Sequence, residues 1–157
     1  MKFPLLALCG IAFAACSPTS QKRTRSEIEG TQAERVARAT KILVKYCQLP
    51  GPLLDAHMAE DIADNSGGMV PGPSDSYLAG VMTFPPSDLS RWRTALSPQL
   101  PDTRVAEFHS VLAAPGWWPA SAAFADCEFY EPRKLTGRPN GFVAISPSAS
   151  AIYFSTF

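Results

Sequence analysis

One segment of the sequence carries an imidazole and two carboxylates at regular spacing. His57, Asp61 and Asp64 occupy positions i, i+4 and i+7, so all three side chains would share one face of a helix. An imidazole beside carboxylates can serve as a general base or as part of a metal site. A metal site also needs a third strong ligand and outer hydrogen-bond partners, and the sequence indicates neither. We therefore favour a solvent-facing polar stripe and expect no bound metal or cofactor.

The other histidine of the chain is a further catalytic candidate. His109 lies close to Glu107 in the sequence, but we favour an exposed or hydrogen-bonded side chain without a catalytic role. The chain contains no G-x-S-x-G, H-E-x-x-H or C-x-x-C motif, and its glycines form no phosphate-binding loop. The sequence therefore does not favour an enzyme.

The segment 114–120 reads APGWWPA and places two tryptophans between two prolines. In an extended backbone neighbouring side chains point to opposite sides, so we expect one indole in the core and the other in a groove or at the surface. An exposed indole supplies large, rigid contact area for recognition. Trp117 and Trp118 are therefore binding candidates, and the Pro-rich loop 67–76 is a second candidate rim. The alternative is a loop that wedges both rings under a sheet.

The N-terminal segment has the form of a secretion signal. Lys2 supplies a positive charge, residues 3–13 form an apolar run, and small residues follow. The apolar run is shorter than the ~20 residues of a transmembrane helix. Every later apolar stretch of the sequence is interrupted by a charged residue, Pro or Gly. We therefore expect an exported protein without a spanning helix.

The four residues Phe13-Ala14-Ala15-Cys16 resemble the lipobox of bacterial lipoproteins, although Phe13 stands where Leu is usual. The resemblance covers roughly the first twenty residues. It implies that residues 1–15 are a signal peptide and that the Cys16 thiol receives a diacylglyceryl group. Ser17 stands where an Asp would retain enteric lipoproteins in the inner membrane, so the resemblance implies an outer-membrane lipoprotein that faces the periplasm. Acylated in this way, the chain would be firmly anchored.

The cysteine count bears on the same question. Of four cysteines, Cys9 would leave with the signal peptide and Cys16 would carry lipid. Cys47 and Cys127 remain as an even pair in an oxidising compartment, so we expect a disulfide between them. Ordinary cleavage after Ala14 would instead leave Cys16 as an unpaired thiol, and we favour the lipoprotein.

The charge balance excludes one class of partner. The chain has 14 basic and 14 acidic residues, which gives no basic footprint for nucleic acid. The basic residues Lys22, Arg23 and Arg25 would follow the anchor and could attract anionic headgroups, but we favour a solvated tether. We expect residues 16–25 to form a lipidated, flexible N-terminus and residues 26–157 to form a single domain.

The helix signals concentrate in the first half of the chain. Ser26 and Glu29 form a capping-box pattern before apolar residues at three- and four-residue spacing, which predicts a helix over 27–47. A shorter helix is expected over 53–63, where it would carry the polar stripe, and another over 88–96.

Strand signals follow. Residues 77–84 and 122–130 are expected to form strands, and 104–113 fits a helix as well as a strand. The β-rich runs 141–146 and 151–157 flank a turn cluster and predict a hairpin. The fold class is therefore α+β, with N-terminal helices packed on a mostly antiparallel sheet that ends in a C-terminal β-hairpin.

These observations favour a lipid-anchored envelope protein that acts as a periplasmic binding or interaction module. Its partner would be an unknown protein, peptide or envelope component. One alternative is a small envelope hydrolase that uses His57, Asp61 or His109, and another is a structural lipoprotein of envelope assembly. Histidines and carboxylates that converge in a cleft would favour the enzyme, whereas an exposed apolar patch without such a cleft would favour the binding module.

Overall fold

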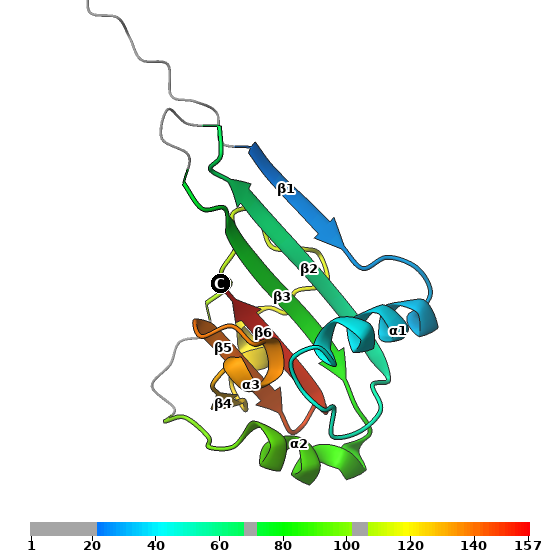
Figure 1. Cartoon of the computed structure of the whole chain (residues 1–157). Coiled ribbons are helices and arrows are strands. Elements are labelled where there is room, and N and C mark those ends of the chain that lie inside the picture. The colour runs from blue at the N-terminus through cyan, green and yellow to red at the C-terminus, as the bar shows by residue number, and fades with distance from the viewer. Residues whose placement is uncertain (1–21, 68–71, 102–106) are drawn as a thin grey trace, which may run out of the picture.

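The fold is built on an open antiparallel sheet with the strand order β1-β2-β3-β6-β5-β4 (Figure 1). The computed structural model describes residues 22–67, 72–101 and 107–157. The strands are β1 (Lys22–Glu27), β2 (Asp55–Asp64), β3 (Asp75–Thr83), β4 (Glu128–Tyr130), β5 (Gly141–Ser146) and β6 (Ala151–Thr156). All neighbouring pairs are antiparallel. The two longest strands, β2 and β3, extend past the ends of β5 and β6.

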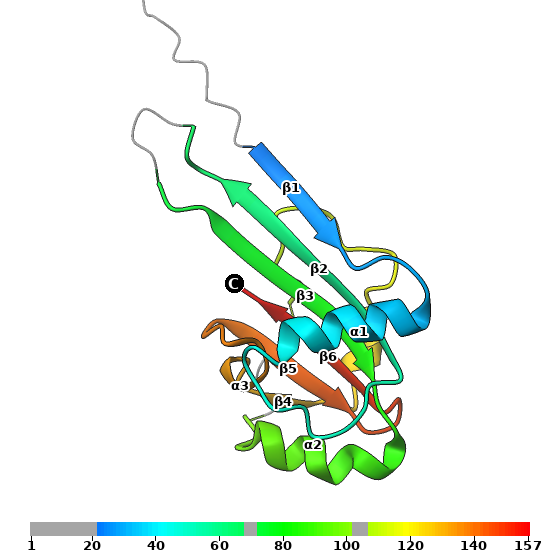
Figure 2. The ribbon, with the colours of Figure 1, turned by 45° about the vertical axis from the view of Figure 1, so that its right-hand side comes forward.

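The two faces of the sheet carry different covers. We call one the helix face, because the helices α1 (Gln32–Leu43), α2 (Leu89–Leu96) and α3 (Arg133–Thr136) lie on its side of the sheet (Figures 1 and 2). We call the other the loop face, because the long connection between α2 and β4 runs behind the sheet there. Side chains alternate between these faces along each strand, so each strand contributes to both.

The main core lies on the helix face. It holds Ala39, Leu43, Leu53, Ala56, Met58, Leu78, Met82, Phe84, Trp92, Leu96, Tyr130, Leu135, Val143, Ile145, Ile152 and Phe154. A smaller cluster lies on the loop face and holds Cys127, Phe129, Phe142, Ala144, Ala151 and Tyr153. Apolar burial is therefore concentrated beneath the helices.

The first helix begins at Gln32 and not, as the sequence pattern predicts, near residue 27. Thr31 is its N-cap: the Thr31 hydroxyl accepts from the Glu34 amide at 3.4 Å, and the Glu34 carboxylate accepts from the Thr31 amide at 2.8 Å. Gly30, with φ of 111°, reverses the chain ahead of this cap. Ser26 lies in β1 instead, opposite Glu60 of β2. The expected capping box was wrong in position, and residues 22–25, expected to form a tether, belong to β1.

The helix predicted over residues 53–63 was also wrong, because this segment forms β2. Ala56 and Met58 point to the helix face, and His57 between them points to the loop face. The spacing of apolar residues in this segment fits a helix as well as a strand. Its backbone finds hydrogen-bond partners in β1 on one side and in β3 on the other. Strand formation here depends on tertiary context more than on local propensity.

Other expectations hold in part. β3 coincides with the strand expected over 77–84, α2 with the helix expected over 88–96, and β5 and β6 form the expected hairpin. Of the strand expected over 122–130, only the last three residues are β4, preceded by a short 3₁₀ turn, Ser121–Phe124. The described residues of 104–113 form neither helix nor strand. The fold is thus mostly antiparallel sheet, with a single helix ahead of β2 in the part described.

The predicted Cys47–Cys127 disulfide is not formed, because both residues are free thiols in the structure. Cys47 packs against the helix-face core, whereas Cys127 belongs to the loop-face cluster. The sheet therefore separates the two sulfur atoms, and an even cysteine count carries no information about which face each residue occupies. Cys16 and the segment that resembles a lipobox lie outside the described residues. Within those residues, every helix is too short or too polar to cross a membrane.

Candidate functional site

The two tryptophans of the long connection have different environments. Trp118 packs into the loop-face cluster, with its ring centroid 4.8 Å from that of Phe108, 6.1 Å from Phe124 and 6.4 Å from Phe142. Its aromatic neighbours come from both the connection and β5, so Trp118 fastens the connection to the sheet. This ring completes a small core.

Trp117 lies at the edge of the same face and is only half-buried. Its indole stacks on the His57 imidazole at a centroid distance of 5.8 Å, and its Nε1 donates to the Glu27 carboxylate at 3.3 Å. The His57 Nε2 atom also lies 3.7 Å from the Asp55 carboxylate. Trp117 therefore lies partly at the surface, at the end of the packed part of the connection, and contacts Glu27 of β1 and His57 of β2.

Asp61 is the buried polar centre of the loop face, with 3% of its surface exposed. The Arg25 guanidinium donates to its two oxygens at 2.7 and 2.9 Å, and the Ser110 hydroxyl donates to it as well. Arg25 also donates to the Ala113 carbonyl at 2.7 Å, and its hydrogen bond with Asp61 raises the pKa of the guanidinium. A carboxylate so engaged holds the connection in place and is not free to act as a base.

The other residues of the expected polar stripe are dispersed. Because β2 is a strand, Asp64 points to the face opposite Asp61, and its carboxylate accepts from the Ser66 amide at 2.9 Å. His57 and Asp61 share a face but lie about 13 Å apart along the strand. The His109 ring packs at a tilt against the Phe157 ring, with their centroids 4.6 Å apart, and the His109 backbone amide donates to the Ser155 hydroxyl at 2.7 Å. The structure therefore does not bring these groups together in one cleft.

Metal-binding geometry is also missing from the part of the chain that the structure describes, where no three His, Cys, Asp or Glu side chains lie close enough to share an ion.

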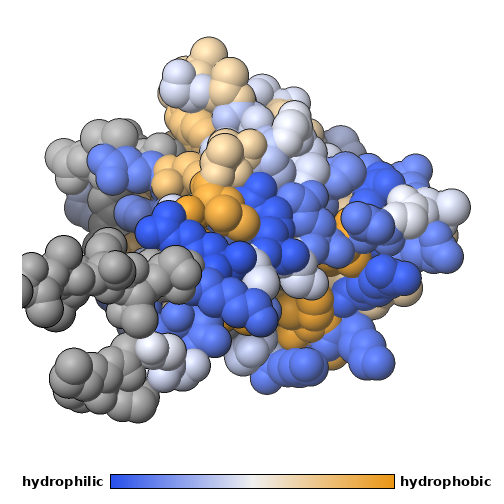
Figure 3. All heavy atoms as spheres, turned by 90° about the horizontal axis from the view of Figure 1, so that it is seen from above, coloured by the Kyte–Doolittle hydropathy of each residue, from blue (hydrophilic) through white to orange (hydrophobic). Residues whose placement is uncertain are grey.

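A groove on the helix face has more suitable chemistry for binding. It runs between the C-terminal half of α1 and the sheet, has a volume of about 440 Å³, and opens to solvent. Seen from above, hydrophobic areas of the surface lie between larger hydrophilic ones (Figure 3). The lining residues are Ser26, Glu27, Ile28, Arg38, Lys41, Ile42, Lys45, Tyr46, Met58, Ala59, Glu60, Leu78 and Arg138.

Arg138 is the most firmly held cation of the groove. Its guanidinium donates to the Glu60 carboxylate at 2.8 Å, to the Ser76 carbonyl at 2.5 Å and to the Ser76 hydroxyl at 3.0 Å. The residue comes from the turn between α3 and β5, yet these bonds direct its side chain over β2 and β3. The groove therefore has one preorganised positive group on the side of the sheet.

The cations on the opposite wall are less constrained. Lys41 and Lys45 are exposed, and neither side chain makes a hydrogen bond or ion pair with another described residue. Arg38, one helical turn before Lys41, lies near Glu34, whose pKa is lowered first by hydrogen bonds with Thr31 and then by the Arg38 charge. Tyr46, 54% exposed, has its ring against Gly137 and connects the two walls. The helix wall thus presents positive charge to the groove.

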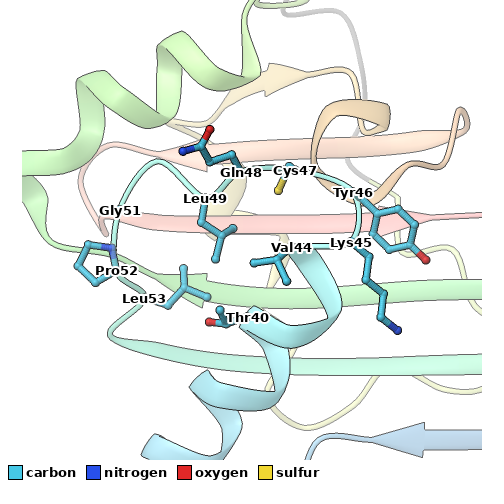
Figure 4. A pocket seen from close by; sticks show the side chains of 10 residues that line it. All are labelled: Thr40, Val44, Lys45, Tyr46, Cys47, Gln48, Leu49, Gly51, Pro52 and Leu53. Carbon is cyan, nitrogen blue, oxygen red and sulfur yellow. The ribbon is translucent and has the colours of Figure 1, made fainter.

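A second, wider cavity lies beside the groove, within the loop between α1 and β2 (Figure 4). Its volume is about 680 Å³. Val44, Leu49 and Leu53 point into the space that the loop encloses, whereas Lys45 and Tyr46 point away from it. Burial raises the pKa of the Cys47 thiol in its wall, so this thiol is not an activated nucleophile. The cavity offers apolar surface without convergent charge.

Sequence reasoning missed the groove. Arg38, Lys41 and Lys45 follow one another at three- and four-residue spacing, which is a usable signal for a cationic helix face, but we assigned that face no role. Arg138 had no local signal, because it lies nearly one hundred residues further along the chain. Arg138 reaches the groove because it bonds Glu60 of β2 and Ser76 of β3, which the pairing of these two strands brings close together.

Comparisons with known proteins identify no relative: no family model matches the chain, and no curated protein or solved structure is significantly similar to it.

Proposed function

We propose that this protein is a lipid-anchored bacterial envelope protein whose domain binds an envelope component in the helix-face groove. The observation that supports this most directly is the groove itself, which joins an apolar floor to a cationic rim and which no described segment covers. Ligand sites combine an apolar lining with a few convergent polar groups. Trp117 bonds the Glu27 carboxylate on the loop face and does not line this groove.

The anchor follows from the resemblance of residues 13–16 to a lipobox. Lys22, the first residue of β1, lies six residues after Cys16, a stretch that reaches at most about 20 Å. If Cys16 carries lipid, the start of β1 is held close to the membrane surface, in the outer membrane facing the periplasm. The groove lies at the far end of β1, next to Ile28.

The anchor is tested by metabolic labelling with an alkynyl fatty acid. Cys16→Ser should abolish the label, because the thioether needs the thiol, and Cys9→Ser should retain it as the matched control. Equal labelling of the Cys16→Ser protein would refute the lipid anchor.

Groove binding is tested by photo-crosslinking in cells. A benzoylphenylalanine at Tyr46 borders the groove, whereas the same group at Leu54, 48% exposed, does not. We expect an adduct from position 46 that is absent from position 54 and is weakened by Lys41→Glu with Lys45→Glu. The same adducts from both positions, or none from position 46, would contradict the proposal.

The hydrolase alternative is less well supported. It requires His57, Asp61 and His109 to converge, and each of these residues is engaged with different partners. None of them lines the groove.

A further inference from the structure

We propose that the groove binds an anionic amphiphile, a molecule with a carboxylate or phosphate headgroup and an apolar chain. This inference rests on the proposed function, since it names the ligand class of the same groove. The headgroup would lie between the lysines of α1 and its following turn and Arg138, and the chain would lie on the apolar floor.

Charge is the first argument. The groove is lined by four cations, Arg38, Lys41, Lys45 and Arg138, and by the Glu60 carboxylate, whereas the Glu27 carboxylate points to the loop face, where it accepts from Trp117. The Glu60 carboxylate already has partners, because it accepts from Arg138 and from Ser76 at 2.5 Å. Lys41 and Lys45 have no such partner among the described residues. An anion would therefore gain charge-assisted hydrogen bonds without displacing existing ones from these lysines.

The floor is the second argument. Met58 and Leu78 of the sheet are already buried beneath the groove, so the apolar surface open to a ligand belongs mainly to Ile28 and Ile42, which are partly buried in its walls. A simple inorganic anion would use the cations alone and leave this surface wet. A ligand with an apolar part would cover it as well, and burial of apolar surface is favourable.

The size of the groove indicates a small ligand. Its volume of about 440 Å³ falls within the range of about 300–1,000 Å³ that small-molecule sites occupy. Two sources have the required chemistry: a free single-chain acid, or an anionic phospholipid of the membrane to which the anchor would hold the domain. They share the headgroup charge and differ in the number of chains.

Native mass spectrometry of the full lipidated protein, released from a non-ionic detergent, tests the proposal. We expect a one-to-one adduct with dodecyl phosphate that is at least about tenfold stronger than one with dodecyltrimethylammonium, because the chains match and only the headgroup charge differs. Dioctanoyl phosphatidylglycerol, with dioctanoyl phosphatidylcholine as its neutral control, forms the second arm. Adducts in the first arm alone identify a free single-chain ligand, and adducts in both identify a phospholipid as well.

Variants connect the adduct to the groove. Lys41→Glu and Lys45→Glu should each weaken the dodecyl phosphate adduct about fivefold or more, with unchanged melting temperature because both side chains are exposed. Arg133→Glu is the matched control, since it makes the same charge change on an exposed residue outside the groove and should have no effect. Equal binding of the cationic amphiphile, or equal loss in the control, would overturn the proposal.

Failure of this inference is distinguishable from failure of the proposed function. A groove-specific crosslink from position 46 to a peptide, without any amphiphile adduct, would support the proposed binding function. It would refute the proposal that the ligand is an anionic amphiphile. Loss of both signals would refute both.

Discussion

The helix face and the loop face of the sheet are held by different interactions. Beneath the helices, large side chains such as Trp92, Phe84 and Phe154 are fully buried in a continuous apolar core. On the loop face, a connection with little regular structure is fastened by aromatic contacts around Trp118 and by the buried Asp61 group. The comparison indicates that stability resides mainly on the helix face, while specific polar contacts order the loop face.

The same comparison bears on the binding surface that we propose. The sequence drew attention to the tryptophans of the loop face, yet most of that aromatic surface is used internally. The helix face is only partly covered, because α1 is shorter than the strands it crosses, and its uncovered edge forms the groove. The face with the larger core therefore also carries the groove for which we propose a ligand.

The largest effect is expected for Trp92→Ala. Trp92 is 1% exposed, and its ring centroid lies 5.8 Å from that of Phe84. Loss of this ring should therefore lower the free energy of unfolding by about 3–5 kcal/mol. Its Nε1 has no hydrogen-bond partner among the described residues, so Trp92→Phe should cost less. Urea unfolding followed by circular dichroism measures both. A Trp92→Ala protein as stable as the wild type would end the assignment of the main core to the helix face.

A smaller loss is expected when the polar fastening of the loop face is broken. Asp61→Ala leaves the Arg25 guanidinium without its carboxylate and should cost about 2–3 kcal/mol, less than a fully buried pair because Arg25 retains some exposure. The connection should also become sensitive to limited proteolysis near Ala113. Asp61→Asn, which keeps a hydrogen-bond acceptor, should be intermediate. Unchanged proteolysis would show that the aromatic contacts suffice.

The two loop-face tryptophans should differ from one another. Trp118→Ala removes a ring with four aromatic neighbours and should cost about 2 kcal/mol. Trp117→Ala removes a half-buried ring and one hydrogen bond and should cost about 1 kcal/mol. Thermal melts of the two variants give the order. The reverse order would mean that Trp117, not Trp118, fastens the connection.

The smallest effect concerns thiol chemistry, without a change in stability. Burial, followed by the charges of Asp126 and Glu128, raises the pKa of Cys127 to about 12, and burial alone raises that of Cys47. At pH 8 the thiolate fraction of Cys127 is therefore far smaller, and Cys47, which is more exposed, should react first with Ellman's reagent. Both should react quickly in urea. Absence of both thiols before reduction would instead demonstrate the disulfide.

Local signals were sufficient for several elements and insufficient for others. The turn cluster between β5 and β6, and the Pro residues ahead of α2, mark structure that depends on adjacent residues. The charged segment 22–27 has no apolar period, so nothing in it predicts β1. It becomes a strand because β2 offers a hydrogen-bonding edge, with Arg25 directly opposite Asp61.

The same distinction separates the predicted site residues from the groove. The sequence alone predicted that two adjacent indoles diverge and that residues 141–157 form an antiparallel hairpin, since each depends on neighbours in the chain. Export of the chain stays a prediction. Contacts between distant parts of the chain determine the other features. They place His57 and Asp61 on one face of β2, Cys47 and Cys127 on opposite faces of the sheet, and Arg138 in the groove that Lys41 also lines. Burial and strand partners are properties of distant contacts, and no local pattern specifies them.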